Sequence, residues 1–399
     1  MAKNIKKFRK DLEQIITTSK DIYILGHNDP DFDAIGSAIG IAKICQILKK
    51  DPYIVIKEDN ARLQPKVKAV KDENNSRFNF INVEQFLDDL ALLIPRESLM
   101  DYIEADDITR REILQRVKLK NSTLIITDTN NLDLISIKDY IGAFQNIVVI
   151  DHHEKIEGQD YRPTITFIDN EYSSASEIVA TMLHAYQEKY CDSVALALAA
   201  GILLDTDGFK KKDTENTHRV YSVIKKNGVT NEKINALLAK DYETEKLVSN
   251  LVFYGDNCRT FRDLLKGSNV SIIVNRENPG LVLKPEIIAM MADRRQEFAD
   301  TDVTISFGYT MLDDDKMIKA SVRTNGYIDG CKLVSDYREL DKHRPGGGAV
   351  QLAGGAIQSA AMFIKSDDIL GEEQLFIDYL KDKDSEDFKP KKKIKNRSE

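Results

Sequence analysis

The sequence predicts an α/β protein with an N-terminal parallel sheet and a smaller C-terminal α/β domain, joined by a helical linker. Apolar runs of strand length alternate with helix-length segments over the first 225 residues. Three of those runs end in loops that carry aspartate or histidine, and their connections favour parallel order. A chain of 399 residues is also too long for one typical domain, so two are expected.

The N-terminal elements follow from the periodicity of apolar residues. Residues 4–20 have their apolar side chains near one helix face, and 34–48 continue as an apolar helix. Helices are also expected at 83–93 and 101–120, and a helix is favoured for the wholly apolar run 195–204. Short apolar runs predict five strands, at 22–25, 53–56, 78–81, 122–127 and 146–150.

The C-terminal half has a different alternation. Helices are predicted at 217–228 and 230–251, the second linking the domains. Three strands are then predicted, at 270–274, 303–309 and 317–323. Two helices are predicted at 285–298 and 330–337. A glycine-rich stretch at 344–355 precedes a last helix. The predicted division is a first domain 1–225, a linker 226–265, a second domain 266–375 and a charged, disordered tail 376–399.

Composition limits the classes of function. A net charge of -8 argues against a broad surface for long nucleic acid, but permits a small anionic substrate held by local positive groups. No apolar stretch reaches the roughly 18 residues of a membrane span, and the N-terminus lacks the apolar block of a signal peptide. The four cysteines lie far apart, which favours free thiols in a reducing compartment. We therefore expect a cytoplasmic enzyme without a membrane partner.

The most informative stretch is the loop after the first predicted strand. It contains His27, Asp29, Asp31 and Asp33 within seven residues, directly before a helix. Three carboxylates this close together repel one another unless a cation lies among them. An aspartate that caps the helix N-terminus would account for one of these residues, but not for all four. A metal site is therefore the favoured interpretation.

Similar residues follow three later apolar segments. Asp128 follows the strand at 122–127, Asp151, His152 and His153 follow the strand at 146–150, and Asp205 follows the apolar helix. We expect these loops to open on one edge of the sheet. Histidine and aspartate without cysteine suit Mn²⁺ or Mg²⁺, and so many ligands predict two ions that share a carboxylate. Such a pair stabilises a phosphoryl displacement and activates water.

These residues also carry a resemblance to a known family. His27-x3-Asp31-x-Asp33, Asp128-Thr, Asp151-His-His153 and Asp205 in a Gly-Ile-Leu-Leu-Asp-Thr context resemble the motifs of the DHH phosphoesterase superfamily. The segments 173–177, 288–293 and 320–323 are similar to those of bacterial cyclic-di-AMP phosphodiesterases and their short-oligonucleotide relatives. The resemblance covers roughly residues 15–365, with an enlarged segment between 60 and 120.

The resemblance implies a role for each motif residue. One metal ion would be held by His27, Asp31 and Asp128, and the other by Asp33, Asp128, His152 and Asp205. Asp151 would support the histidine pair, and His153 would face the substrate phosphate as a donor or acid. Asp29 matches no ligand position. Mn²⁺ is the expected ion, with Mg²⁺ or Co²⁺ as alternatives.

The second domain resembles the DHH-associated substrate domain. There Arg323 would clamp a phosphate beside Ser321, and the glycine run Gly346, Gly347 and Gly348 would bind phosphate through backbone N–H groups. In the family a histidine follows the glycines, whereas this chain has Ala349. His343, six residues earlier, is the candidate to occupy the same space.

Several functions therefore stay open. The first is a two-metal phosphodiesterase that hydrolyses cyclic-di-AMP or its linear product pApA to AMP. The alternatives are a nanoRNA-degrading enzyme or 3′-phosphoadenosine phosphate phosphatase on the same core, and a non-catalytic nucleotide-binding regulator. The expected partner is a small nucleotide, and a homodimer is one option for assembly.

Other polar residues have simpler explanations. Asp207 and Gly208 suit a turn, and Ser173 to Ser176 suit a helix cap. His184 and His218 fit surface or core positions, and Arg294 and Arg295 are expected on a helix surface. None of these residues is needed as a metal ligand.

Overall fold

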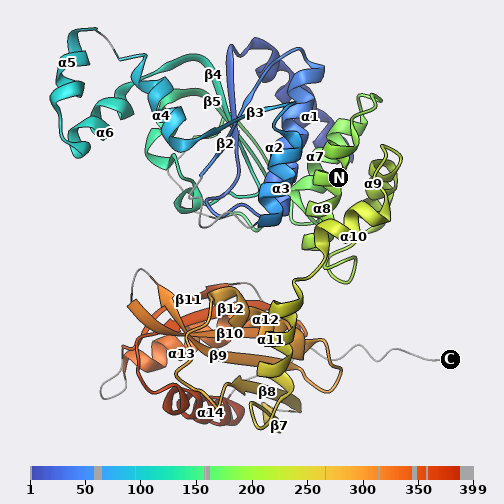
Figure 1. The fold of residues 1–399 in the computed structure, drawn as a ribbon, viewed down its shortest axis with the longest axis vertical. Coiled ribbons are helices and arrows are strands. Elements are labelled where there is room, and N and C mark those ends of the chain that lie inside the picture. Colours follow the sequence, from blue (N-terminus) through green and yellow to red (C-terminus); the bar gives the residue numbers. More distant parts are fainter. Residues whose placement is uncertain are drawn as a thin grey trace. The chain divides into compact units, whose positions relative to one another are not determined.

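The computed structural model describes residues 2–57, 65–94, 96–156, 158, 162–265, 267–312, 315–343, 348–355 and 358–386. The chain divides into two compact units, Met1–Ala239 and Lys240–Glu399. Each unit contains a sheet with helices packed on it (Figure 1), so the predicted α/β fold is confirmed.

The first unit is built on a six-stranded parallel sheet with the order β3-β2-β1-β4-β5-β6. Its strands are β1 (Asp21–Leu25), β2 (Tyr53–Ile56), β3 (Asn79–Asn82), β4 (Leu119–Thr127), β5 (Phe144–Asp151) and β6 (Ile165–Ile168). The five predicted strands of this half are confirmed, and β6 was not predicted. The chain turns in opposite directions after β1 and β4, and ligands bind beside such a switch point in open α/β sheets.

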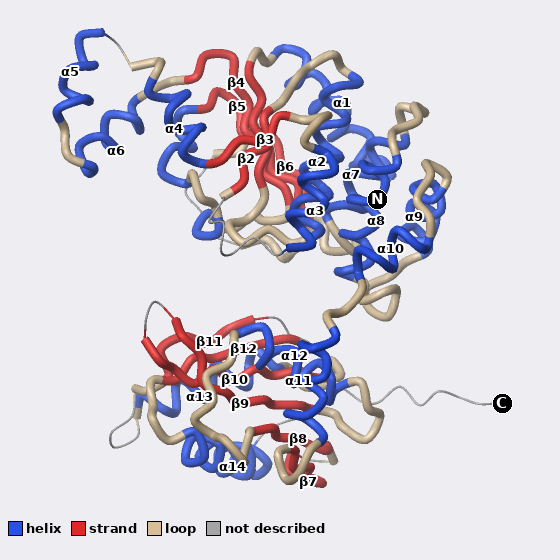
Figure 2. The backbone as a smooth tube through the Cα atoms, viewed as in Figure 1, coloured by secondary structure: helices blue, strands red, loops and turns tan. Residues whose placement is uncertain are grey.

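Helices cover both faces of this sheet (Figure 2). On one face lie α1 (Ala2–Thr18), α2 (Phe32–Ile47), α7 (Ala175–His184) and α8 (Asp192–Asp205), whose apolar residues pack with Ile22 and Ile24. On the other face, α4 (Val83–Ala91) and α6 (Asp107–Arg116) pack with Tyr23 and Leu25. The unit also contains α3 (Pro65–Asn74), α5 (Arg96–Glu104), η1 (Leu132–Leu134), η2 (Lys138–Ala143), α9 (Glu215–Lys225) and α10 (Asn231–Leu238).

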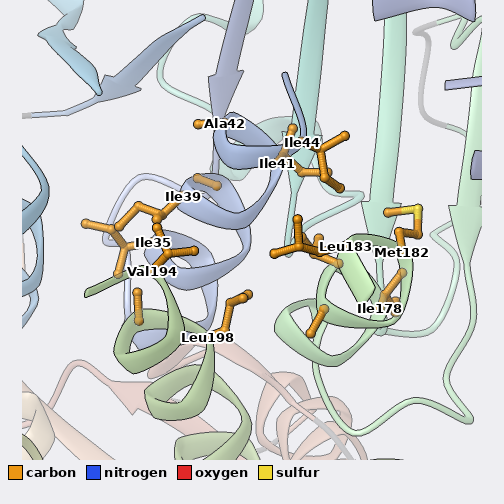
Figure 3. Close-up of a cluster of buried hydrophobic side chains, with 14 of the residues drawn as sticks. Ile35, Ile39, Ile41, Ala42, Ile44, Ile178, Met182, Leu183, Val194 and Leu198 are labelled. Atoms are coloured by element: carbon orange, nitrogen blue, oxygen red, sulfur yellow. The ribbon is translucent and has the colours of Figure 1, made fainter. Parts of the chain in front are cut away.

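Helix α2 is apolar on all sides because it lies between the sheet and the helices α7 and α8. Its isoleucines contact Ile178 of α7 and Leu198 of α8 in one cluster (Figure 3). A Cβ atom at Gly36 would lie 2.5 Å from the carbonyl oxygen of Ala197. The small residues of α2 therefore allow close approach to neighbouring helices rather than to the sheet.

The second unit is built on a mixed sheet with the order β11-β12-β10-β9-β8-β7. Its strands are β7 (Cys258–Leu265), β8 (Ser268–Val274), β9 (Val303–Leu312), β10 (Asp315–Thr324), β11 (Val350–Gly355) and β12 (Ser359–Ile364). Helices α11 (Tyr242–Phe253) and α12 (Pro285–Gln296) pack on one face. Helices α13 (Gly330–Lys342) and α14 (Ile369–Glu386) pack on the other.

Several boundaries differ from the predicted ones. The predicted linker helix is two helices, α10 in the first unit and α11 in the second, because the chain leaves helical geometry at Ala239. The glycine-rich stretch leads into β11 and β12 rather than directly into a helix. The tail expected from residue 376 begins inside α14, whose Phe376 and Leu380 are buried in the core. Apolar burial therefore places the first part of the predicted tail in helix α14, which ends at Glu386, and residues 387–399 lie outside the described part.

Two further findings concern composition. In the described residues, no helix has both the length and the apolar character needed to cross a membrane. All four cysteines carry free thiols.

Arg295, expected on the surface, is buried and donates two hydrogen bonds to Asp300, so that expectation was wrong.

Candidate metal centre

The predicted metal ligands come together at the carboxyl edge of the first sheet. His27 follows β1, Asp128 follows β4, and His152 follows β5, while Asp33 lies in the first turn of α2 and Asp205 ends α8. Segments almost 180 residues apart in sequence therefore meet beside the switch point between β1 and β4.

One group of ligands surrounds His27. Its Nε2 atom lies 3.6 Å from Asp128 Oδ2 and 3.9 Å from Asp31 Oδ1. The three side chains offer ligand atoms that all lie within 4.8 Å of one another, which could hold a metal ion. These are the residues predicted for the first ion.

A second group surrounds His152. Its Nε2 atom lies 3.0 Å from Asp205 Oδ2, 3.4 Å from Asp128 Oδ1 and 3.8 Å from Asp33 Oδ2. The ligand atoms of Asp33, His152 and Asp205 also lie within 4.8 Å of one another. Asp128 presents one carboxylate oxygen to each group, as expected of a bridging ligand.

Asp33 is held in place by the helix α7. Its carboxylate accepts hydrogen bonds from the backbone N–H groups of Ala175 (2.7 Å) and Ser176 (2.8 Å), in the first turn of that helix. The Ser174 hydroxyl caps the same helix by accepting from the N–H of Glu177, so the predicted cap is confirmed. The N-terminus of a helix attracts a carboxylate, so α7 holds Asp33 with backbone N–H groups and without a cationic side chain.

Asp151 orients the histidine pair rather than binding at the centre of either group. Its Oδ1 atom accepts from the backbone N–H of His152 and lies 2.8 Å from Nδ1 of His153. Its Oδ2 atom accepts a 2.6 Å hydrogen bond from Asn130. Asn130 had no predicted role, although an amide two residues after a strand-end aspartate was a signal that could have been used.

The electrostatics of the site reflect crowded, buried acids. Burial, together with the Asp128 charge, raises the pKa of Asp31 to about 6 and raises that of Asp33 above its usual range. Burial alone would lower the pKa of His152, but the carboxylates of Asp128 and Asp205 raise it above its usual value. Positive charge is therefore strongly favoured among these acids.

The donor set fits divalent metal ions. Asp128 Oδ1 and both ring nitrogens of His152 are buried, and none of them makes a hydrogen bond of good geometry with another described residue, although Nε2 lies 3.0 Å from Asp205 Oδ2. Buried polar atoms are nearly always satisfied, and two imidazoles with four carboxylates are typical ligands of Mn²⁺ or Mg²⁺. The unsatisfied atoms and the chemistry of the ligands both indicate a metal site.

A pocket of about 290 Å³ opens at these ligands. Besides the metal-site residues it is lined by Thr129, Asn130, Asn131, Leu134 and Ile156, none of which had a predicted role. His153 lines the pocket and is 56% exposed, so its ring can reach a bound molecule. The pocket combines a charged floor with two apolar side chains.

The predicted substrate residues of the second unit have varied surroundings. Arg323, on β10, donates from Nε to Asp293 Oδ1 at 2.5 Å, and the Ser321 hydroxyl is buried without a hydrogen-bond partner among the described residues. The N–H of Gly348 donates to Asp341, so this amide is occupied within the chain. His343 directly follows α13 and is exposed, and Gly346 and Gly347 lie outside the described residues.

The remaining polar residues have structural roles, as expected. His184 Nε2 lies 2.8 Å from the Tyr190 hydroxyl, and His218 Nε2 lies 2.7 Å from Asp213 Oδ2. Asp207 and Gly208 both have positive φ angles and form the turn after α8.

Two similar curated proteins are the cyclic-di-AMP phosphodiesterases PdeA of Listeria monocytogenes, 27% identical over 325 residues, and GdpP of Bacillus subtilis, 25% identical over 363 residues. The matches cover 80% and 89% of this chain but 43% and 48% of those proteins, so the chain spans about half their length.

Two further comparisons concern the fold and the family. An exopolyphosphatase-related protein from Bacteroides fragilis has a similar fold, with a TM-score of 0.67 and 14% identity, covering 96% of this chain and 98% of that one. The model of the DHH family, N-terminal domain, matches residues 21–202, which include every predicted metal ligand except Asp205. Residues 21–202 of this chain are thus similar to the N-terminal domain of the DHH family.

Proposed function

We propose that this chain is a phosphodiesterase that uses two divalent metal ions to hydrolyse cyclic-di-AMP, or its linear product pApA, to AMP. The observation that carries the proposal is the pair of ligand groups that share Asp128. A second support is that PdeA and GdpP are both named as cyclic-di-AMP phosphodiesterases. Mn²⁺ is the proposed ion, because the donors are oxygen and imidazole nitrogen.

The ligand residues would work as a fixed frame. Two ions held there would supply charge for the phosphate oxygens and make water a nucleophile near neutral pH. His27, Asp31 and Asp128 would hold one ion, and Asp33, Asp128, His152 and Asp205 the other. Helix α7 holds Asp33 by two hydrogen bonds, and Asp128 directly follows strand β4. These two ligands would therefore need little rearrangement to bind the ions.

His153 is the proposed proton donor to the leaving oxygen. Its Nδ1 atom is held by Asp151, which leaves Nε2 facing away from that carboxylate on a half-exposed ring. The contact between Nδ1 and Asp151 orients the ring, so that Nε2 is the nitrogen available to a bound molecule. Asn130 keeps Asp151 in position and so acts as a positioning residue.

Arg323 and Ser321 are the proposed phosphate-binding residues of the second unit. Asp293 fixes the Arg323 guanidinium through its Nε and Nη2 atoms, which orients a cation that is still partly exposed. Ala349 offers no side-chain donor after the glycine run. The proposed consequence is that phosphate affinity in this unit depends on Arg323 more than on the glycine loop.

Turnover of a substrate panel tests the function. Purified full-length chain is incubated with cyclic-di-AMP, cyclic-di-GMP, pApA, two- to five-nucleotide RNA and 3′-phosphoadenosine phosphate, with and without Mn²⁺. Release of pApA or AMP that requires Mn²⁺ is expected. Preference for RNA or 3′-phosphoadenosine phosphate would reassign the substrate, and binding of nucleotides without turnover would favour the non-catalytic regulator.

A matched pair of variants tests the site itself. Asp128→Asn should lower turnover at least about 100-fold, because it weakens both ligand groups. Asp29→Asn is the control, since Asp29 is an exposed aspartate of the same acidic loop and belongs to neither group. Equal activity of the two variants would rule out the metal centre as the catalytic site.

A further inference from the structure

Two large apolar side chains stand at the metal pocket. Leu134 is 47% exposed and Ile156 is 41% exposed, and both line the pocket together with the metal-site residues His27, Asp128 and Asp205. An exposed isoleucine or leucine needs no explanation by itself. Two exposed apolar side chains beside a cluster of acids do need an explanation, because they can bind neither cations nor phosphates.

Leu134 is fixed relative to the first ligand group. It ends the short helix η1, and its carbonyl oxygen accepts a 2.7 Å hydrogen bond from the N–H of Asn28, the residue after His27. The next apolar residues of its loop, Ile135 and Ile137, are buried in the core of the first unit. The side chain of Leu134 is therefore held out toward the pocket by a loop anchored on both sides.

Ile156 is fixed through the loop after β5. Its N–H donates a 2.8 Å hydrogen bond to Asn130 Oδ1, and the amide nitrogen of the same side chain donates to Asp151 and to the carbonyl oxygen of Glu154. Asn130 lies two residues after Asp128. Leu134 is thus held by the residue next to His27, and Ile156 by a residue close to Asp128.

We propose that Leu134 and Ile156 form an apolar platform for the nucleobase of the nucleotide whose phosphate is bound at the metal centre. The remainder of the pocket lining is polar or charged, apart from the methyl group of Thr129, so these two side chains are the apolar surface available to the flat face of a base. Aliphatic contact of this kind recognises shape and area rather than hydrogen-bonding edges, so it favours purines over pyrimidines without selecting one purine. This inference rests on the proposed function and names the substrate moiety that the site would bind.

A comparison of matched substrates tests the platform. Leu134→Ala and Ile156→Ala are assayed with Mn²⁺ on pApA and on the same dinucleotide with abasic sugars. Each variant should raise the KM for pApA about five- to tenfold and leave kcat within about twofold. The KM for the abasic substrate should stay unchanged. Leu92→Ala is the control, because Leu92 is 83% exposed in the same unit and does not line the pocket.

Binding measurements separate this inference from the proposed function. Calorimetry should give the same Mn²⁺ affinity for the wild type and both variants, and a five- to tenfold weaker affinity for AMP in the variants only. Ribose 5-phosphate should bind all three proteins equally. If the variants lose affinity for Mn²⁺ or for both ligands alike, the side chains support the loops and the platform is wrong. If the wild type binds AMP as described but hydrolyses no dinucleotide, the proposed function fails and the platform stands.

Discussion

Asp128 is the residue on which both ligand groups depend. It is only 3% exposed and has a φ angle of 62°, a left-handed conformation that side-chain-bearing residues rarely adopt. Its N–H donates to the carbonyl oxygen of Ile150, which ties the unusual backbone to the neighbouring strand β5. Backbone strain of this kind persists where the surrounding structure holds it and is common at functional sites. Here it directs one carboxylate toward both His27 and His152.

The first residue-scale prediction concerns Asn130. Asn130→Ala removes the 2.6 Å hydrogen bond that holds Asp151, the carboxylate that orients the His153 ring. We expect turnover to fall about 10- to 100-fold, the usual effect of losing a partner behind the ligands.

Asn146→Ala provides the matched control for this prediction. Asn146 also connects β5 to β4, but from near the start of β5 to Thr123 in the middle of β4, away from the metal ligands. If the two variants lose activity equally while both remain folded, then Asn130 acts only by joining the strands.

The second residue-scale prediction concerns His184. Burial, with a smaller effect from the Arg219 charge, lowers its pKa to about 4, whereas an unfolded histidine titrates near 6.5. Between these values the unfolded chain binds more protons, so the free energy of unfolding should fall as the pH decreases from 6.5 to 4. The slope is at most about 1.4 kcal/mol per pH unit.

Urea titrations at several pH values measure this slope. His184→Asn should flatten it, because that variant lacks the buried histidine. An unchanged slope in His184→Asn would show that another group controls acid sensitivity.

At the scale of elements, the site depends on how closely α2, α7 and α8 approach one another. Asp33 comes from α2, the two backbone donors that hold it come from α7, and Asp205 ends α8. The approach requires glycine at Gly36 and Gly201, where a Cβ atom would meet the neighbouring helices at 2.3–2.5 Å. Helix packing therefore determines metal geometry in this protein.

Gly201→Ala tests this dependence. The new methyl group would lie 2.3 Å from the Ser176 hydroxyl oxygen and 2.8 Å from Asp33 Oδ1, so Asp33 must move. We expect a loss of about 1–3 kcal/mol in the free energy of unfolding and a weaker affinity for Mn²⁺. Gly142→Ala is the control, because a Cβ atom there meets only Lys118 Nζ, at 3.7 Å. Calorimetric Mn²⁺ affinity that is unaffected by Gly201→Ala would contradict the packing argument.

The elements also show what the sequence could predict. Strands β1, β4 and β5 were predictable because each is a buried apolar run that leads into an acidic loop. Strands β6, β7, β11 and β12 were missed. Of these, β6, β7 and β11 are edge strands, which are only partly buried, so their polar residues interrupt the apolar pattern. Long-range contacts such as those of Asn130 depend on pairing between β4 and β5, which spacing alone does not specify.

At the scale of the whole molecule, the two units have separate hydrophobic cores. The core clusters that include Ile39 and Leu124 lie entirely in the first unit, and those that include Phe307 and Met291 lie entirely in the second. The two groups of metal ligands belong to the first unit alone. Stabilisation by metal should therefore be confined to one of the two cores.

Differential scanning calorimetry of the full chain tests this separation. Ligands that bind only the folded state stabilise it by about 2.7 kcal/mol at 100 times their dissociation constant. For a unit of this size we expect Mn²⁺ to raise one unfolding transition by roughly 5–10 °C and EDTA to reverse the shift, while a second transition stays in place. Asp128→Asn should abolish the shift without changing the second transition. If Mn²⁺ moved both transitions together, the two cores would unfold as one cooperative unit, and metal binding in the first would stabilise the second as well.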